Sequence, residues 1–98
     1  MSHLQNKIAV ISGGATLIGS AVAQALMDAG ASVALFDIDR EAGLKVAAEL
    51  GERAVFFHLD VTDDELIAHA VEEVRARFGG IDLLINLACT YSDQGFAS

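Results

Sequence analysis

The sequence has no proline or tryptophan, only one cysteine, and few basic residues. With Cys89 as its single cysteine, the chain forms no internal disulfide and no cysteine-based metal cluster. Six Lys and Arg residues stand against fourteen Asp and Glu residues, which gives a net charge of -8. Nucleic acids and anionic membrane surfaces both attract basic side chains. The acidic balance therefore excludes both as expected partners.

A continuous apolar run of membrane-spanning length is also lacking. Residues 8–27 carry no charge, but Gly13, Gly14 and Gly19 interrupt them, and their second half is amphipathic. We therefore expect no targeting segment and a cytoplasmic protein. The three histidines are far apart in the sequence and show no ligand spacing, so no metal site is predicted.

Short apolar strands alternate with amphipathic helices along the chain. The pattern predicts strands at residues 7–11, 32–36, 54–59 and 81–87. It predicts helices at 17–29 and 41–50, and a third that Thr62 or Asp63 caps and that ends at Phe78 before Gly79. The order βαβαβαβ, with nearly continuous apolar strands, predicts an α/β fold. We expect a doubly wound parallel sheet of the Rossmann type, covered by helices on both faces as a three-layer αβα structure.

Apolar residues spaced three and four apart predict which side of each helix faces the sheet. In the first helix they are Ile18, Ala21, Val22, Ala25, Leu26 and Ala29, in the second Leu44, Ala47 and Ala48, and in the third Leu66, Ile67, Ala70, Val71, Val74 and Phe78. Small Ala21 and Ala25 would let the first helix lie close to the sheet.

The pattern ends after Ala88. We expect residues 1–89 to form a dinucleotide-binding half-domain, truncated after the fourth strand, and residues 90–98 to form an irregular tail. A parallel sheet that stops there leaves an open edge, which proteins usually avoid. The open edge predicts self-association into a homo-oligomer.

The most informative segment is residues 12–19, Ser-Gly-Gly-Ala-Thr-Leu-Ile-Gly, between the first strand and the first helix. A strand, a glycine-bearing turn and a helix present backbone N–H groups to a phosphate, and glycine lets the backbone approach the anion. The helix N-terminus adds a partial positive charge. The segment predicts a site for a nucleotide-like cofactor.

Further polar residues follow the second, third and fourth strands, at the edge where open α/β sheets bind ligands. Asp37 lies eighteen residues beyond Gly19, close to the spacing expected of an acid that accepts hydrogen bonds from ribose hydroxyls. Its charge favours NAD over NADP. Asp60 and Val61 are placed to contact an adenine ring. The candidate cofactor-binding residues are Ser12, Gly13, Thr16, Leu17, Ile18, Gly19, Asp37, Ile38, Asp60, Val61, Asn86 and Ala88.

These residues resemble the short-chain dehydrogenase/reductase family over residues 6–89. The family's glycine motif is usually Thr-Gly-x-x-x-Gly-x-Gly. Ser12, Gly13 and Gly19 match it, whereas Leu17 replaces the middle glycine. Leu17 thus adds a side chain where the family's backbone approaches the pyrophosphate.

The resemblance continues at the later strand ends. Asp37 and Asp60 match the family's acidic residues after the second and third strands. The family's Asn-Asn-Ala-Gly motif corresponds to residues 86–89, of which Asn86 and Ala88 are retained.

The resemblance implies hydride transfer between a nicotinamide and a small-molecule alcohol or carbonyl substrate. In the family, a serine and a Tyr-x-x-x-Lys pair perform the acid–base chemistry. Tyr91 is the only tyrosine here, and Gly95 stands where the lysine would be. The resemblance therefore implies the cofactor-binding half of an NAD-dependent oxidoreductase, with no catalytic residue among these 98.

Two alternatives remain open. The chain is either that half or a non-catalytic nucleotide-binding or interaction module. A methyltransferase-like nucleotide fold also uses a glycine turn and an acid after the second strand, but Asp60 and Asn86 disfavour it.

Overall fold

The computed structural model describes residues 3–87, which form one parallel sheet with three helices. The strands and helices follow one another as β1 (Ile8–Ser12), α1 (Leu17–Asp28), β2 (Ser32–Asp37), α2 (Arg40–Leu50), β3 (Ala54–His58), α3 (Asp64–Phe78) and β4 (Leu83–Asn86). The expectations for Ala88, Cys89, Tyr91 and the tail at 90–98 lie outside the described residues. The predicted α/β order is confirmed.

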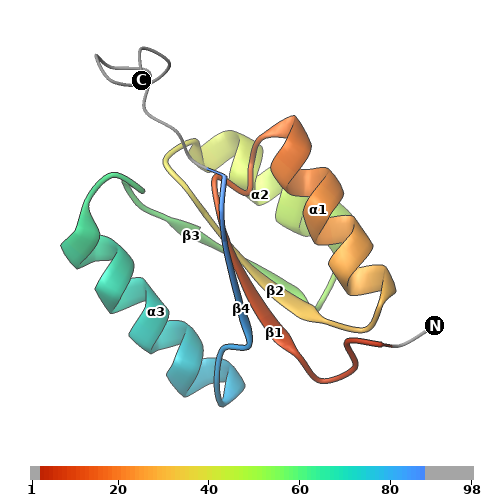
Figure 1. The fold of residues 1–98 in the computed structure, drawn as a ribbon. Helices are drawn as coiled ribbons and strands as arrows, with labels where there is room; N and C mark the ends of the chain where they lie inside the picture. Colours follow the sequence, from red (N-terminus) through yellow and green to blue (C-terminus); the bar gives the residue numbers. More distant parts are fainter. Residues whose placement is uncertain (1–2, 88–98) are drawn as a thin grey trace, which may run out of the picture.

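The sheet has the strand order β3-β2-β1-β4, and all neighbouring strands are parallel. Helices α1 and α2 lie on one face, and α3 lies on the other (Figure 1). This is the predicted three-layer Rossmann-type architecture. From β1 the strand order runs to β2 and β3 on one side and continues with β4 on the other. The carboxyl ends of β1 and β4 therefore flank the point where the strand order changes direction, which is the usual ligand position in such sheets.

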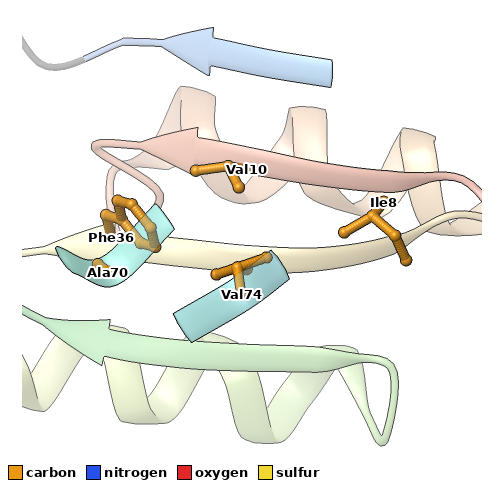
Figure 2. Packing of buried hydrophobic residues seen from close by; sticks show 6 residues of the cluster. Ile8, Val10, Phe36, Ala70 and Val74 are labelled. Carbon is orange, nitrogen blue, oxygen red and sulfur yellow. The ribbon is translucent and has the colours of Figure 1, made fainter. Parts of the chain in front are cut away.

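The two central strands supply the core on both faces of the sheet. Every residue of β1 is buried, because helices cover both sides of it. On the α3 face the buried cluster is Ile8, Val10, Ala34, Phe36, Ala70 and Val74, most of which Figure 2 labels. On the opposite face it is Ala9, Ile11, Ala23, Met27, Val33 and Leu35.

The outer strands are less covered. Residues of β4 alternate between half-buried and exposed, and Leu84 is 64% exposed on the α3 face, level with Val10. Within residues 3–87, β1 is the one strand paired with β4. Asp82 fixes the start of β4, since its carboxylate accepts from Ile8 N (2.9 Å) and its own N–H donates to Ile8 O (2.8 Å).

The helix ends follow the expected signals. Asp63, one of the two predicted caps, accepts hydrogen bonds from the N–H groups of Glu65 and Leu66 at the start of α3. Gly79 ends this helix in the left-handed conformation. None of the helices within the described part of the chain is long and apolar enough to cross a membrane.

The predicted inward faces of α1 and α2 are wrong in part. Ile18, Ala21 and Ala25 are exposed, and Gly19, Ala23 and Met27 are the buried residues of α1. The physical reason is that α1 is apolar over most of its circumference, so the spacing of apolar residues did not single out one side.

In α2 the buried residue is Gly43, while Leu44 is 53% exposed and Ala48 is exposed. A Cβ at position 43 would overlap the ring of Phe56, so the absence of a side chain lets α2 approach β3. The prediction for α3 is correct except for Leu66, which is 43% exposed. The predicted starts of β2 and β3 are correct, and the other strand ends differ from the prediction by one or two residues.

The face of α1 is testable with two matched substitutions. Ala23→Leu inserts three carbons into a fully buried position and is expected to destabilise the fold by about 1–3 kcal/mol. Ala21→Leu is expected to change stability by less than about 0.5 kcal/mol, since position 21 is exposed. Urea denaturation followed by circular dichroism measures both. Equal destabilisation by the two leucines would contradict the observed orientation of α1.

Candidate cofactor-binding site

The glycine turn is held against the carboxyl end of β2. The N–H groups of Gly13 and Gly14 both donate to the carbonyl oxygen of Phe36, at 2.7 and 3.2 Å. Ala15 N donates to Oδ2 of Asp37 at 2.9 Å. Gly13 has a φ of 86°, which favours glycine, so the chain turns sharply after β1 and reaches β2. The turn is therefore fixed in place by backbone and carboxylate acceptors.

Thr16 begins α1 as a hydrogen-bonded cap. Its hydroxyl donates to Gly13 O at 2.8 Å and accepts from Gly19 N at 2.9 Å. A Cβ at position 19 would overlap Gly13 O and lie 2.9 Å from the Cα of Gly14. Glycine at position 19 is thus required for α1 to approach the turn.

Two backbone donors remain at the start of α1. Between residues 13 and 20, the amides of Leu17 and Ile18 find no acceptor in the part of the chain that the structure describes, whereas the other amides are bonded. Adjacent free N–H groups at a helix N-terminus form an anion-binding arrangement. Most of the other N–H groups between residues 13 and 20 are used to hold the turn itself, so these two are the amides left for a ligand.

No acidic side chain lies in the first turn of α1, whereas α2 has Glu41 and α3 has Asp64 and Glu65 there. The partial positive charge at the start of α1 is therefore not offset by carboxylates of its own first turn. This condition suits an anionic ligand.

Asp37 has a structural role as well as the one expected from the sequence. It is 9% exposed, and its two carboxylate oxygens accept from Ala15 N (2.9 Å) and from Asp39 N (3.0 Å). Each carboxylate oxygen retains acceptor capacity beyond one hydrogen bond. Asp37 therefore joins the glycine turn to the end of β2 and still has capacity to accept from a ligand hydroxyl.

Asp60 lies in the loop after β3 and is bonded within that loop. The Thr62 hydroxyl at 2.6 Å and the Thr62 N–H at 2.9 Å stabilise its charged form and lower the pKa of the Asp60 carboxyl. Its neighbour Val61 is half-buried and packs against the α3-face cluster. Within residues 3–87 no group of three possible ligands is arranged for a metal ion.

At the other side of the turn, Ser12 and Asn86 stand level in the β1–β4 register. Ser12 Oγ is buried and has no hydrogen-bond partner among residues 3–87. Asn86 is exposed at the carboxyl end of β4. Ala88, the last of the candidate site residues, lies outside the described part of the chain.

Three exposed apolar side chains stand at the start of α1 and directly after β2. Leu17 is 88% exposed, Ile18 66% and Ile38 59%. Ile38 O also lies 3.0 Å from Nε2 of His58, which ties the loop after β2 to the end of β3. Apolar side chains next to free amides suit a ligand that carries both rings and anionic groups.

A profile of the family described as short chain dehydrogenase matches residues 7–98. The chain belongs to the short-chain dehydrogenase family. It is 44% identical over 89 residues to sorbitol dehydrogenase of Cereibacter sphaeroides, covering 91% of this chain and 35% of that protein. It is 38% identical over 87 residues to 3-hydroxyacyl-CoA dehydrogenase type-2 of Drosophila melanogaster, covering 89% of this chain and 34% of that protein.

Solved structures of similar fold include family members with bound cofactor. NAD⁺-bound xylitol dehydrogenase matches with a TM-score of 0.85 and 34% identity, over 90% of this chain and 35% of its own. The NADH complex of 3-ketoacyl-(acyl-carrier-protein) reductase from Brucella melitensis matches with a TM-score of 0.78 and 31% identity, over 83% and 33%. The chain spans about a third of the length of these relatives.

Sequence reasoning missed two parts of this site. The Phe36 carbonyl, which anchors the turn, belongs to an apolar residue and leaves no signal in a residue pattern. The sequence also did not predict that Leu17 and Ile18, rather than their neighbours, have the free N–H groups. Which amides are free depends on the acceptors that the neighbouring amides reach, and only the three-dimensional arrangement fixes this.

The close approach at Gly19 gives a testable expectation. Gly19→Ala forces the turn and α1 apart and is expected to lower the free energy of unfolding by about 1–3 kcal/mol, despite the better helix propensity of alanine. Gly80→Ala is the matched control, because a Cβ there meets nothing within 4 Å, and it should stay within about 1 kcal/mol of the parent. A Gly19→Ala variant as stable as Gly80→Ala in urea would refute the close contact.

Proposed function

We propose that this chain is the dinucleotide-binding part of an NAD-dependent oxidoreductase. The observation that carries the proposal is the pair of free amides, Leu17 and Ile18, at the start of α1, with the Asp37 carboxylate bonded to the same turn. The amides suit the pyrophosphate, and Asp37 suits the hydroxyls of the adenosine ribose. The bound nicotinamide would supply or accept a hydride.

The other candidate residues take supporting roles in this proposal. Gly13, Thr16 and Gly19 shape the turn through the contacts described above. Ile38, Asp60 and Val61, which follow β2 and β3, would border the adenine. Ser12 and Asn86 would lie toward the nicotinamide, on the β1–β4 side, and Ala88 is proposed from the sequence alone.

The charge around Asp37 supports NAD in preference to NADP. A 2′-phosphate would meet the Asp37 carboxylate, and Asp39 carries a second one two residues later. The nearest basic residue in the sequence is Arg40, which is exposed at the first position of α2. Repulsion between like charges near the protein surface is on the order of 1 kcal/mol or more at contact distances.

The substrate of the whole protein is proposed to be a small alcohol or carbonyl compound. This follows from the family, whose similar members here include dehydrogenases and a reductase by name. Tyr91 has no lysine four residues later, so the Tyr-x-x-x-Lys pair of the family is absent from these 98 residues. We propose that residues 1–98 bind cofactor and that they alone do not turn over substrate.

A binding or interaction module without catalysis remains the second candidate, because the free amides and Asp37 need no catalytic residue to bind a dinucleotide. Membership of the short-chain dehydrogenase family removes the support for a methyltransferase-like fold. Self-association stays a proposal, supported by the exposed Leu84 and the outer edge of β4. The cytoplasmic location stays a prediction.

The cofactor preference is testable by fluorescence titration of NADH and NADPH. The parent is expected to bind NADH at least about tenfold more tightly, roughly 1.4 kcal/mol. Asp37→Ala removes a ribose acceptor and a charge that repels the 2′-phosphate, so it should weaken NADH binding more than NADPH binding. Asp39→Ala removes the second nearby carboxylate, which caps α2, and should reduce the preference for NADH less than Asp37→Ala does. Equal losses for both cofactors in Asp37→Ala would count against the assigned role.

A further inference from the structure

At the start of α1, the backbone of Leu17 favours the binding of an anion, whereas its apolar side chain disfavours it. Its N–H is one of the two free donors of the turn, and its side chain is the most exposed of the large apolar side chains among residues 3–87, at 88%. Side chains of a helix lean toward its N-terminus, so the Leu17 side chain leans toward the space in front of the free amides. An anion that reaches those amides has to approach beside it.

At 88% exposure the Leu17 side chain buries little surface against the described part of the chain, so it contributes little to the core. It borders an open groove of about 290 Å³ between α1 and α2, together with Ala15 and Thr16 of the turn and Ala42 and Lys45 of α2. Ala15 is the residue whose N–H is bonded to Asp37. Leu17 therefore stands beside the segment that joins the free amides to the carboxylate.

We propose that Leu17 is an affinity- and specificity-determining residue that weakens the binding of diphosphates at this turn; the proposal rests on the proposed function. A hydrogen bond from a backbone N–H to a phosphate oxygen requires about 2.7–2.9 Å between the two heavy atoms. A leucine beside that bond shields the phosphate from water on one side and narrows the approach. Glycine at this position lets the backbone meet a pyrophosphate directly.

The effect is specific to the diphosphate portion of the ligand. Adenosine carries the ribose hydroxyls and the adenine ring but no phosphate, so its binding at Asp37 does not involve the amides of Leu17 and Ile18. Removing the Leu17 side chain should therefore raise affinity for ADP and NADH and leave affinity for adenosine unchanged.

The test is isothermal titration of NADH, ADP and adenosine into the full chain as parent, Leu17→Gly and Leu17→Ala. We expect about tenfold tighter binding of NADH and ADP to Leu17→Gly, and an intermediate gain for Leu17→Ala. The alanine variant keeps good helix propensity and so separates the side-chain effect from a backbone effect. Leu44→Ala, which removes an exposed leucine of α2 that does not line the groove, should bind all three ligands as the parent does.

Three outcomes would overturn the proposal. Measurable but equal affinities of parent and both Leu17 variants for NADH and ADP would overturn it and leave the proposed function standing. An equal gain for adenosine would show that Leu17 acts on something other than the diphosphate. No binding of NADH to any of the variants at millimolar concentration would overturn this proposal and the proposed function together.

Discussion

The attachment of the glycine turn to the carboxyl end of β2 is the constraint on which the site depends. The Phe36 carbonyl accepts two amides of the turn, and the Asp37 carboxylate accepts a third. Together with the bonds that Thr16 N, Gly19 N and Ser20 N make to Gly13 and Thr16, these bonds use most of the amides of the turn and leave those of Leu17 and Ile18 free. Because Gly19 has no side chain, α1 starts directly on this turn, so the direction of its free amides is set by the end of a buried strand.

The same strand links the core to the site. The Phe36 side chain is fully buried on the α3 face and meets Phe57 edge to face, with 5.4 Å between ring centroids. Its carbonyl belongs to the turn, and the next residue, Asp37, presents its carboxylate there. A change in packing under α3 would thus move the acceptors of the turn. Because these acceptors belong to a buried strand, they are positioned more precisely than acceptors on a loop would be.

The sequence was sufficient to predict the order of elements, because buried parallel strands and capped helices leave strong local signals, such as Asp63 before α3 and Gly79 after it. It was insufficient for the buried face of α1, since an almost uniformly apolar helix has no preferred side until a sheet is packed against it. In the candidate site, the turn and Asp37 were predicted from residue types and spacing. The bond between them, and the exposure of Leu17, arise from contacts between distant segments and have no local signal.

The most direct measurement of the central claim is a titration of ADP into the ¹⁵N-labelled chain, followed by the backbone amide resonances. We predict that the largest amide shifts, typical of new hydrogen bonds to phosphate, occur at Leu17 and Ile18. We predict small shifts at Gly13 and Gly14, whose N–H groups remain bonded to Phe36 O. The largest shifts at residues far from the start of α1, or no shift at Leu17 and Ile18 when ADP is bound, would contradict the central claim.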